Sequence, residues 1–255
     1  MGFFYFYRMD IRQYLDSTYL KTASQAGLTK AENVAVVKGF VQEAIDEKFK
    51  LIMIRPDMVT MAKEMILAAN SKVTIGTVID FPDGNGLLEA KLKEAEKAIN
   101  DGADDLDYVV DYEAFKRGEI DVVKKQVLEG TRLGLSHNKI VKWIIEVAAL
   151  NEHQIVQLSA LIKNVVMANF KESQYANVFV KSSTGFYKTM DGLPNGATVA
   201  TIKLMIENSF PLPVKAAGGV RTYNEALEMI ALGVKRIGTS SAKAIANGEI
   251  SKNEY

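Results

Sequence analysis

Short apolar runs alternate with longer segments in which apolar residues recur every three or four positions. The short runs are rich in valine and isoleucine, which is typical of buried strands. They predict eight strands, at Tyr14–Asp16, Lys50–Arg55, Val73–Asp80, Leu106–Asp111, Ile140–Glu146, Val178–Ser182, Pro213–Ala217 and Arg236–Thr239. The longer segments predict helices with one apolar face, for example Val34, Val37, Val41 and Ala44 or Ile45, and again Leu88, Leu92, Ala95 and Ile99.

Helix ends are also readable. Thr29-x-x-Glu32 and Thr222-x-x-Glu225 have the pattern of a capping box, in which the two side chains bind the free N–H groups of a first helical turn. Gly102 and Gly233 follow apolar stripes, where glycine commonly ends a helix. These signals predict strands and helices in strict alternation along the chain.

Eight βα units in 255 residues predict a single-domain (β/α)8 barrel, because barrels of this type have about 250 residues. A doubly wound parallel sheet shares the alternation, but no G-x-G-x-x-G motif follows the first strand. We assign residues 10–250 to the barrel and 251–255 to a mobile tail. Residues 1–9 form an N-terminal extension, either upstream of a biological start at Met9 or packed against the barrel.

Composition narrows the function. Lysine plus arginine equals aspartate plus glutamate, 31 of each, so we expect no nucleic-acid partner and no membrane surface. No segment has the roughly 20 apolar residues of a membrane span. The chain has no cysteine, which agrees with a cytoplasmic location, and neither of its 2 histidines lies in a zinc-binding pattern. We therefore expect a small-molecule enzyme without a metal or cofactor.

Two lysines lie near the ends of predicted buried strands. Lys181 belongs to Val178-Phe-Val-Lys-Ser-Ser-Thr-Gly185 and Lys215 to Val214-Lys-Ala-Ala-Gly-Gly-Val-Arg221. If these strands are parallel neighbours, about 4.8 Å apart, burial and mutual repulsion both favour the neutral amine, which is a nucleophile. The alternative is that both lysines reach solvent at the strand ends or form stabilising ion pairs.

Carboxylates occupy similar positions. Asp107 lies within an apolar strand and requires a cationic partner, so it is either part of a catalytic site with the lysines or half of a structural ion pair. Asp16 lies at the end of the first strand and is either a site residue or a loop cap, and Glu146 is expected to be structural. Because barrel strands converge at one mouth, the acids and lysines could share a pocket.

Glycine, serine and arginine follow the last strands, where barrels commonly bind phosphate. The residues are Gly218, Gly219, Arg221, Gly238, Ser240 and Ser241. Glycine lets backbone N–H groups approach an anion, and Arg221 could either contact a phosphate or form a rim salt bridge. With a reactive amine nearby, this pattern indicates a phosphorylated carbonyl substrate.

At these residues the chain resembles the deoxyribose-phosphate aldolase family over nearly its full length. The matching motifs are Leu15-Asp16-x-Thr18, Phe81-Pro82-x-Gly84, Gly102-Ala-Asp-Asp-Leu-Asp107, Lys142-x-Ile-Ile-Glu146, Val180-Lys-Ser-Ser-Thr-Gly185, Val214-Lys-Ala-Ala-Gly-Gly-Val-Arg-Thr222 and Arg236-Ile-Gly-Thr-Ser-Ser241. The family consists of class I aldolases with a barrel fold. The resemblance therefore implies phosphosugar and aldehyde substrates, and cleavage of 2-deoxy-D-ribose 5-phosphate to D-glyceraldehyde 3-phosphate and acetaldehyde.

The resemblance also implies individual roles. Lys181 would form the Schiff base, Lys215 would lower its pKa and join proton transfer, and Asp107 would move protons. Substrate contacts would come from Asp16, Thr184, Gly185, Gly218, Gly219, Arg221, Gly238, Ser240 and Ser241. Phe186 stands where some members have lysine, which places more weight on Arg221, and Tyr255 stands in a tail that certain relatives use as a proton shuttle.

Two alternative functions and the oligomeric state stay open at this point. A Schiff-base aldolase acting on a ketose phosphate is the nearest alternative, although a bisphosphate would require a second anion site. A non-catalytic sugar-phosphate sensor is the other alternative, and it would gain nothing from a reactive amine. A homodimer is one option for the assembly, because symmetric dimers are common, and the sequence does not decide it.

Overall fold

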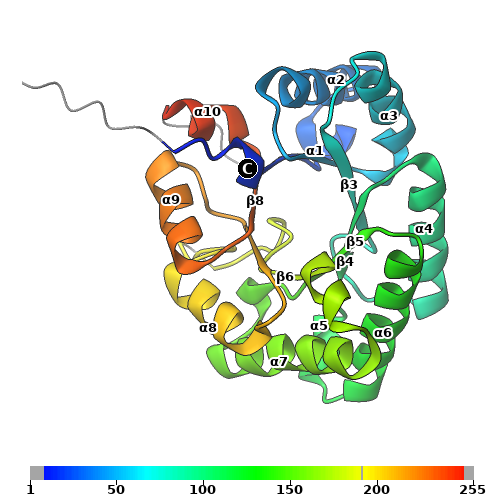
Figure 1. The fold of residues 1–255 in the computed structure, drawn as a ribbon, viewed down its shortest axis with the longest axis vertical. Helices are drawn as coiled ribbons and strands as arrows, with labels where there is room; N and C mark the ends of the chain where they lie inside the picture. The colour runs from blue at the N-terminus through cyan, green and yellow to red at the C-terminus, as the bar shows by residue number, and fades with distance from the viewer. Residues whose placement is uncertain (1–8, 191, 250–255) are drawn as a thin grey trace, which may run out of the picture.

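Each of the eight predicted strands forms, and together they close into a parallel barrel in chain order, with β8 paired to β1 (Figure 1). The structure, a computed structural model, describes residues 9–190 and 192–249. The strands are β1 (Leu15–Tyr19), β2 (Leu51–Ile54), β3 (Thr74–Ile79), β4 (Asp105–Val109), β5 (Ile140–Ile144), β6 (Val178–Lys181), β7 (Val214–Ala217) and β8 (Arg236–Thr239). The predicted barrel is confirmed, and the doubly wound sheet is excluded because the sheet has no open edge.

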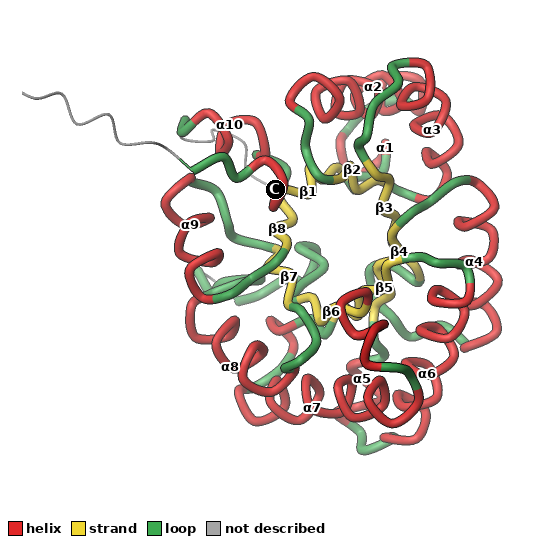
Figure 2. Tube along the Cα trace, in the orientation of Figure 1, coloured by secondary structure: helices red, strands yellow, loops and turns green. Residues whose placement is uncertain are grey.

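Helices form the outer layer around this ring of strands (Figure 2). They are α1 (Ala23–Ala26), α2 (Lys30–Glu47), α3 (Val59–Ala68), α4 (Leu88–Asp101), α5 (Tyr112–Lys116), α6 (Ile120–Ser136), α7 (Glu152–Asn169), α8 (Val199–Ser209), α9 (Tyr223–Leu232) and α10 (Ala242–Asn247). Short 3-10 turns occur at Arg12–Tyr14, Pro56–Met58, Val147–Ala149 and Glu172–Asn177. None of the helices in the described ranges is long and apolar enough to span a membrane.

Both predicted capping boxes are present. Thr29 and Thr222 accept hydrogen bonds from the backbone N–H groups of Glu32 and Glu225, and each glutamate binds back to its threonine N–H. Gly102 and Gly233 end α4 and α9 in the left-handed conformation, with φ of 108° and 109°. The helix boundaries expected from these residues are thereby confirmed.

The predicted apolar stripe of α4 is confirmed in part, since Ala95 is buried and Ile99 packs against the core. The buried residues of this helix are Lys91, Ala95 and Ala98, whereas Leu88 and Ile99 are only half-buried. Lys91 is tolerated inside because its ammonium group donates to the carbonyls of Gly84 and Val109 and to the Gln126 side chain, at 2.7 to 2.9 Å. Its Nζ atom also lies 3.2 Å from the Asp80 carboxylate. A hydrophobic period cannot reveal a lysine whose donors find partners elsewhere in the chain.

The first strand also begins and ends later than predicted, at Leu15–Tyr19 in place of Tyr14–Asp16. Ser17 and Thr18 interrupt the apolar run, yet both pair in register with β2. The N-terminal extension, except for Met9, and the C-terminal tail lie outside the described residues. The predictions about them, including the role of Tyr255, stay predictions.

Alternation along the strands separates two environments. In β4, Leu106 and Tyr108 belong to the large apolar core beneath the helices, whereas Asp105 and Asp107 lie on the other face. Lys142 on β5 pairs in register with Asp107, and Lys181 on β6 pairs with Lys215 on β7. Because successive side chains point to opposite faces of a sheet, this register places the charged groups inside the barrel.

Helix α6 lies close to the sheet because two of its glycines leave room for strand side chains. The rings of Tyr108 and Trp143 stack with their centroids 4.8 Å apart, and a Cβ atom at Gly130 would come within 2.9 Å of the Trp143 ring. A Cβ atom at Gly134 would meet Val141 Cγ2 at 2.3 Å. Larger residues at either position would push the helix off the sheet.

We predict that Gly134→Ala lowers the free energy of unfolding by about 1–3 kcal/mol, because the new methyl group overlaps a rigid strand side chain. Gly39, on the exposed face of α2, has no atom within 4 Å of the corresponding position and provides the control. Gly39→Ala should raise the stability by about 0.5–1 kcal/mol through its higher helix propensity. Urea unfolding followed by circular dichroism measures both, and equal effects would contradict the packing argument.

Candidate active site

Asp107 is the centre of a buried charge cluster inside the barrel. Its Oδ2 atom lies 2.9 Å from Lys181 Nζ and 3.0 Å from Lys215 Nζ, and its Oδ1 atom lies 2.8 Å from Lys142 Nζ. None of the four side chains is more than 4% exposed. The prediction that the two strand-end lysines are neighbours around Asp107 is confirmed in geometry.

A second tier of charges extends the cluster. Asp16 contacts Lys215 Nζ at 2.6 Å and receives a hydrogen bond from Arg236 Nε at 2.7 Å. Asp105 lies 2.6 Å from Lys142 Nζ and 3.5 Å from Arg236. Each carboxylate is therefore shared between at least two cations, as buried charges require.

The cluster contains more cations than anions. Its cations are Lys142, Lys181, Lys215 and Arg236, and its carboxylates are Asp16, Asp105 and Asp107. If all seven were ionised, four positive and three negative charges would leave one positive charge uncompensated. A buried surplus charge is costly, so the cluster favours one neutral member.

Lys181 is the member of the cluster that becomes neutral most readily. Burial lowers its pKa, the nearby Lys215 ammonium lowers it further, and Asp107 only partly offsets these effects, so that the pKa is about 8. Roughly a tenth of the Lys181 side chains are then neutral at pH 7. Burial would raise the pKa of Asp107, but the three lysines around it hold that pKa well below the usual range.

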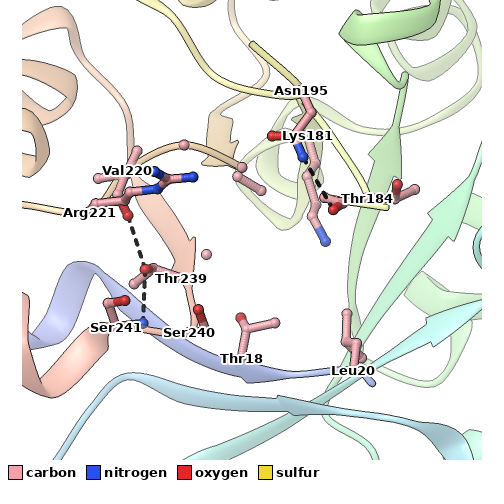
Figure 3. A pocket seen from close by; sticks show the side chains of 15 residues that line it. Thr18, Leu20, Lys181, Thr184, Asn195, Val220, Arg221, Thr239, Ser240 and Ser241 are labelled. Carbon is pink, nitrogen blue, oxygen red and sulfur yellow. Dashed lines mark hydrogen bonds between the residues drawn. The ribbon is translucent and has the colours of Figure 1, made fainter. Parts of the chain in front are cut away.

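Lys181 also opens into a pocket at the carboxyl ends of the strands (Figure 3). The wall on one side follows β7 and β8, and Leu20 lies on the opposite side. The residues that line the pocket are Thr18, Leu20, Lys181, Thr184, Gly185, Asn195, Ala217, Gly218, Gly219, Val220, Arg221, Gly238, Thr239, Ser240 and Ser241. A substrate in this pocket would thus contact the amine of Lys181 and the glycine-rich wall together.

Backbone geometry explains the glycines of this wall. Gly218 and Gly219 adopt φ of 79° and 90°, which side-chain-bearing residues rarely adopt. A Cβ atom at Gly218 would lie 2.9 Å from Gly196 Cα. Among the described residues, no carboxylate forms an ion pair with the guanidinium group of Arg221, so the predicted alternative of a rim salt bridge is not observed.

Glu146 organises the loop that follows Lys181. Ser183 Oγ donates to Glu146 Oε1 at 2.9 Å, and Thr184 donates to Oε2 through its backbone N–H at 3.1 Å and through its hydroxyl. The glutamate is 1% exposed, and burial raises its pKa. This agrees with the structural role expected from the sequence, because the hydrogen bonds fix Thr184 at the pocket.

The structure gathers most of the predicted substrate-binding residues but not all. Thr184, the glycines, Arg221 and the two serines line the pocket, whereas Asp16 is fully buried and is not among the lining residues. Sequence reasoning assigned no role to Lys142, Asp105 or Arg236. Their signal was a charged residue at an inward position of an otherwise apolar strand. Within the described ranges, no group of three or more histidine, cysteine or carboxylate side chains is arranged to hold a metal ion.

A barrel with a buried amine at its mouth is an arrangement suited to carbonyl chemistry, and comparison with known proteins identifies which class it represents. Residues 13–250 match the family described as DeoC/LacD family aldolase. The deoxyribose-phosphate aldolases of Thermococcus gammatolerans and Thermococcus kodakarensis are 37% and 36% identical to the chain. Each alignment covers 94% of this chain, and 96% and 97% of the respective relative.

Solved structures agree with this result. An aldolase named QR15 superposes with a TM-score of 0.77 at 30% identity and covers 94% of this chain and 95% of its own. The deoxyribose phosphate aldolase of Aeropyrum pernix, described as a unique tetramer, gives a TM-score of 0.73 at 26% identity, over 94% and 92% of the two chains. The chain belongs to the DeoC/LacD aldolase family. It is an aldolase, and hence a lyase, related to the deoxyribose-phosphate aldolases.

We predict that Lys142→Met lowers the free energy of unfolding by about 3–5 kcal/mol, because it removes the buried hydrogen-bond donor that Asp105 and Asp107 share. Lys116 provides the control, since its contact with Glu113 at 2.9 Å lies on the surface. Lys116→Met should change the stability by less than about 1 kcal/mol. Guanidinium unfolding at pH 7 measures both, and similar losses would show that Lys142 is not a structural support of the cluster.

Proposed function

We propose that the protein is a class I aldolase that reversibly cleaves 2-deoxy-D-ribose 5-phosphate to D-glyceraldehyde 3-phosphate and acetaldehyde. The observation that carries this proposal is the position of Lys181, a buried lysine with a pKa of about 8 that opens into a pocket. Only the neutral amine can attack a carbonyl carbon, and this environment supplies it near neutral pH. Because the two Thermococcus relatives are named deoxyribose-phosphate aldolases, we take deoxyribose phosphate as the substrate.

In the first half of the reaction, the Lys181 amine attacks C1 of the open-chain sugar, and loss of water from the carbinolamine gives an iminium ion. Asp107 and Lys215, acting through water, are the proposed relay that takes the proton from the C3 hydroxyl to solvent and later supplies the proton to the enamine. Loss of the C3 hydroxyl proton breaks the C2–C3 bond, and the electron pair of that bond moves into the iminium to form an enamine. D-glyceraldehyde 3-phosphate leaves with C3 as its new aldehyde carbon. Protonation of the enamine at C2 and hydrolysis release acetaldehyde and restore the amine.

We infer that Asp107 and Lys215 move protons at the amine. The contacts from Lys215 Nζ to Asp107 Oδ2 and from that oxygen to Lys181 Nζ form a continuous path, with steps of 3.0 and 2.9 Å. A proton that leaves Lys181 on attack can return along this path to the departing hydroxyl group of the carbinolamine. Because its pKa is low, Asp107 passes protons between its cationic neighbours and does not itself remain protonated.

The glycine-rich side of the pocket is the proposed phosphate site. Gly185, Gly218, Gly219, Gly238, Ser240 and Ser241 supply small or hydroxylated positions where backbone N–H groups can approach an anion, and Arg221 supplies the charge. Phe186 follows Gly185 and adds no charge. More of the phosphate affinity is therefore expected to depend on Arg221.

Location and assembly stay predictions. A cytoplasmic location is inferred from the lack of cysteine in the sequence, and the homodimer from the symmetry common among enzymes. The Aeropyrum pernix relative is described as a tetramer, so higher assemblies occur in the family.

We predict that acetaldehyde with sodium borohydride leaves one ethyl group on Lys181, because reduction traps the imine between donor and enzyme. Lys181→Met should abolish both this adduct and turnover. Lys215→Met serves as the matched control, since it should slow the trapping while the adduct still forms at Lys181. Peptide mass spectrometry at low acetaldehyde, where exposed lysines react little, measures the site.

An ethyl group on a different lysine, or none on a folded protein, would contradict the assignment of Lys181. The same trapping with dihydroxyacetone phosphate then tests the ketose-phosphate alternative. A protein that gives no adduct with either carbonyl would be a sensor rather than an enzyme.

We predict that Arg221→Ala raises KM for 2-deoxyribose 5-phosphate by about tenfold to a hundredfold, the effect of one hydrogen bond to a charged group. The kcat/KM for unphosphorylated 2-deoxyribose should stay within about twofold. Arg132→Ala, which removes a surface arginine paired with Glu129 at 2.5 Å, should change neither value. An equal loss with both sugars in steady-state assays would exclude Arg221 from the phosphate site.

A further inference from the structure

The pocket has an apolar side that the proposed chemistry does not use. Leu51 and Met53 of β2, Val78 of β3 and Leu20, just after β1, form a small buried cluster that is separate from the large core beneath the helices. Leu20 belongs both to this cluster and to the pocket lining. Figure 3 places Leu20 and Arg221 on opposite sides of the pocket, with Lys181 between them.

Two phenylalanines pack behind Leu20 and are not among the residues that line the pocket. Phe81 follows β3 and Phe186 follows β6, and both are half-buried against the cluster of Leu20. Their rings meet edge to face, with centroids 5.1 Å apart and an interplanar angle of 80°. We call Leu20, Phe81 and Phe186 the apolar wall.

Arg55 contacts all three residues of the apolar wall. Its Nε atom donates to the carbonyl oxygen of Leu20 at 2.7 Å, and one terminal nitrogen lies at a longer 3.5 Å from the carbonyl oxygen of Phe81. Its guanidinium carbon lies 4.8 Å from the centre of the Phe81 ring and 5.9 Å from that of Phe186. A planar guanidinium is suited to such combined donation and stacking, whereas an ammonium group is not.

These contacts matter because the strands have already ended at this level. Leu20 lies one residue beyond β1, Phe81 two beyond β3 and Phe186 five beyond β6. The backbone hydrogen bonds that hold neighbouring strands in register do not extend to them. Arg55, the residue directly after β2, therefore cross-links three connections that the sheet leaves free.

We propose that Arg55 is a positioning residue that fixes the apolar wall against the aldehyde end of the substrate. Arg221 and the glycines hold the phosphate, and Leu20, the member of the apolar wall that lines the pocket, limits how far C1 can move away from Lys181. Arg55 touches no reacting atom and acts through Leu20, Phe81 and Phe186. This inference rests on the proposed function, because it concerns the fit of that substrate.

Loss of Arg55 is therefore expected to affect the rate of the chemical step and not the binding of the substrate. Arg55 is not among the residues that line the pocket, so we expect loss of the arginine to leave the affinity for phosphorylated substrate nearly intact. A displaced wall lets C1 occupy positions from which the amine cannot attack, and misplacement by about 1 Å can cost a hundredfold in rate. The effect therefore appears in kcat, in contrast to that of Arg221.

The test compares Arg55→Leu and Arg55→Lys with wild type and with Arg132→Leu, a surface control. Steady-state assays use 2-deoxyribose 5-phosphate and unphosphorylated 2-deoxyribose, and thermal unfolding checks the fold. We expect kcat for the phosphosugar to fall about tenfold to a hundredfold in Arg55→Leu. We expect KM to stay within about threefold and kcat/KM for the unphosphorylated sugar to fall by a similar factor. Arg55→Lys keeps the positive charge but removes the planar guanidinium group and its several N–H donors. We therefore expect most of the loss in kcat to persist in this variant.

Three results would overturn the proposal. Activity within twofold of wild type in both variants would show that the wall needs no cross-link. A loss confined to the phosphosugar and visible in KM would make Arg55 a phosphate ligand. Full rescue by lysine would show that charge alone is required. If Arg55→Leu fails to fold, Arg55→Lys decides, and a wild-type protein without aldolase activity would instead refute the proposed function.

Discussion

A carboxylate with no exposed surface holds three lysine side chains together inside this barrel, and the site depends on that contact. Asp107 is within 3.0 Å of Lys142, Lys181 and Lys215, which come from three consecutive strands. Without the carboxylate, three buried ammonium groups would repel one another, and each would lose its hydration. With it, the lysines stay close enough for one of them to have a lowered pKa while the strand ends remain packed.

The barrel divides its interior between charge and apolar packing. Strands β4 to β8 and β1 supply the ionised side chains, whereas β2 and β3 supply Leu51, Met53 and Val78. A substrate at the mouth is therefore bordered by a polar side that can bind an anion and by an apolar side that can only exclude volume. The same division places the reactive amine of Lys181 between the two and lets each part of the substrate be held by a different physical interaction.

Some of this arrangement could be predicted from the sequence, and the rest depends on partners that are distant along the chain. Lys181 and Lys215 were predicted as neighbours because each ends an apolar run before a glycine and consecutive barrel strands are adjacent. Lys91 was missed because its partners, two backbone carbonyls, the Gln126 amide and the Asp80 carboxylate at 3.2 Å, come from separate segments of the chain. The same holds for Arg55, whose contacts lie in loops after β1, β3 and β6. Periodicity describes which face of an element is buried, but not which polar group will find a partner there.

The charge imbalance of the cluster also bears on the direction of electron flow in the proposed reaction. When Lys181 is an iminium ion, four positive charges face three carboxylates, as they do when it is an ammonium ion. When the C2–C3 bond breaks, the electron pair neutralises the iminium, and three cations then face three carboxylates. Once the proton of the C3 hydroxyl has passed to water outside the cluster, cleavage has removed the one uncompensated charge from a buried set of ion pairs, which stabilises the enamine relative to the iminium. The fixed charges of Lys142 and Arg236, which touch no substrate, would in this way assist the step that the enzyme catalyses.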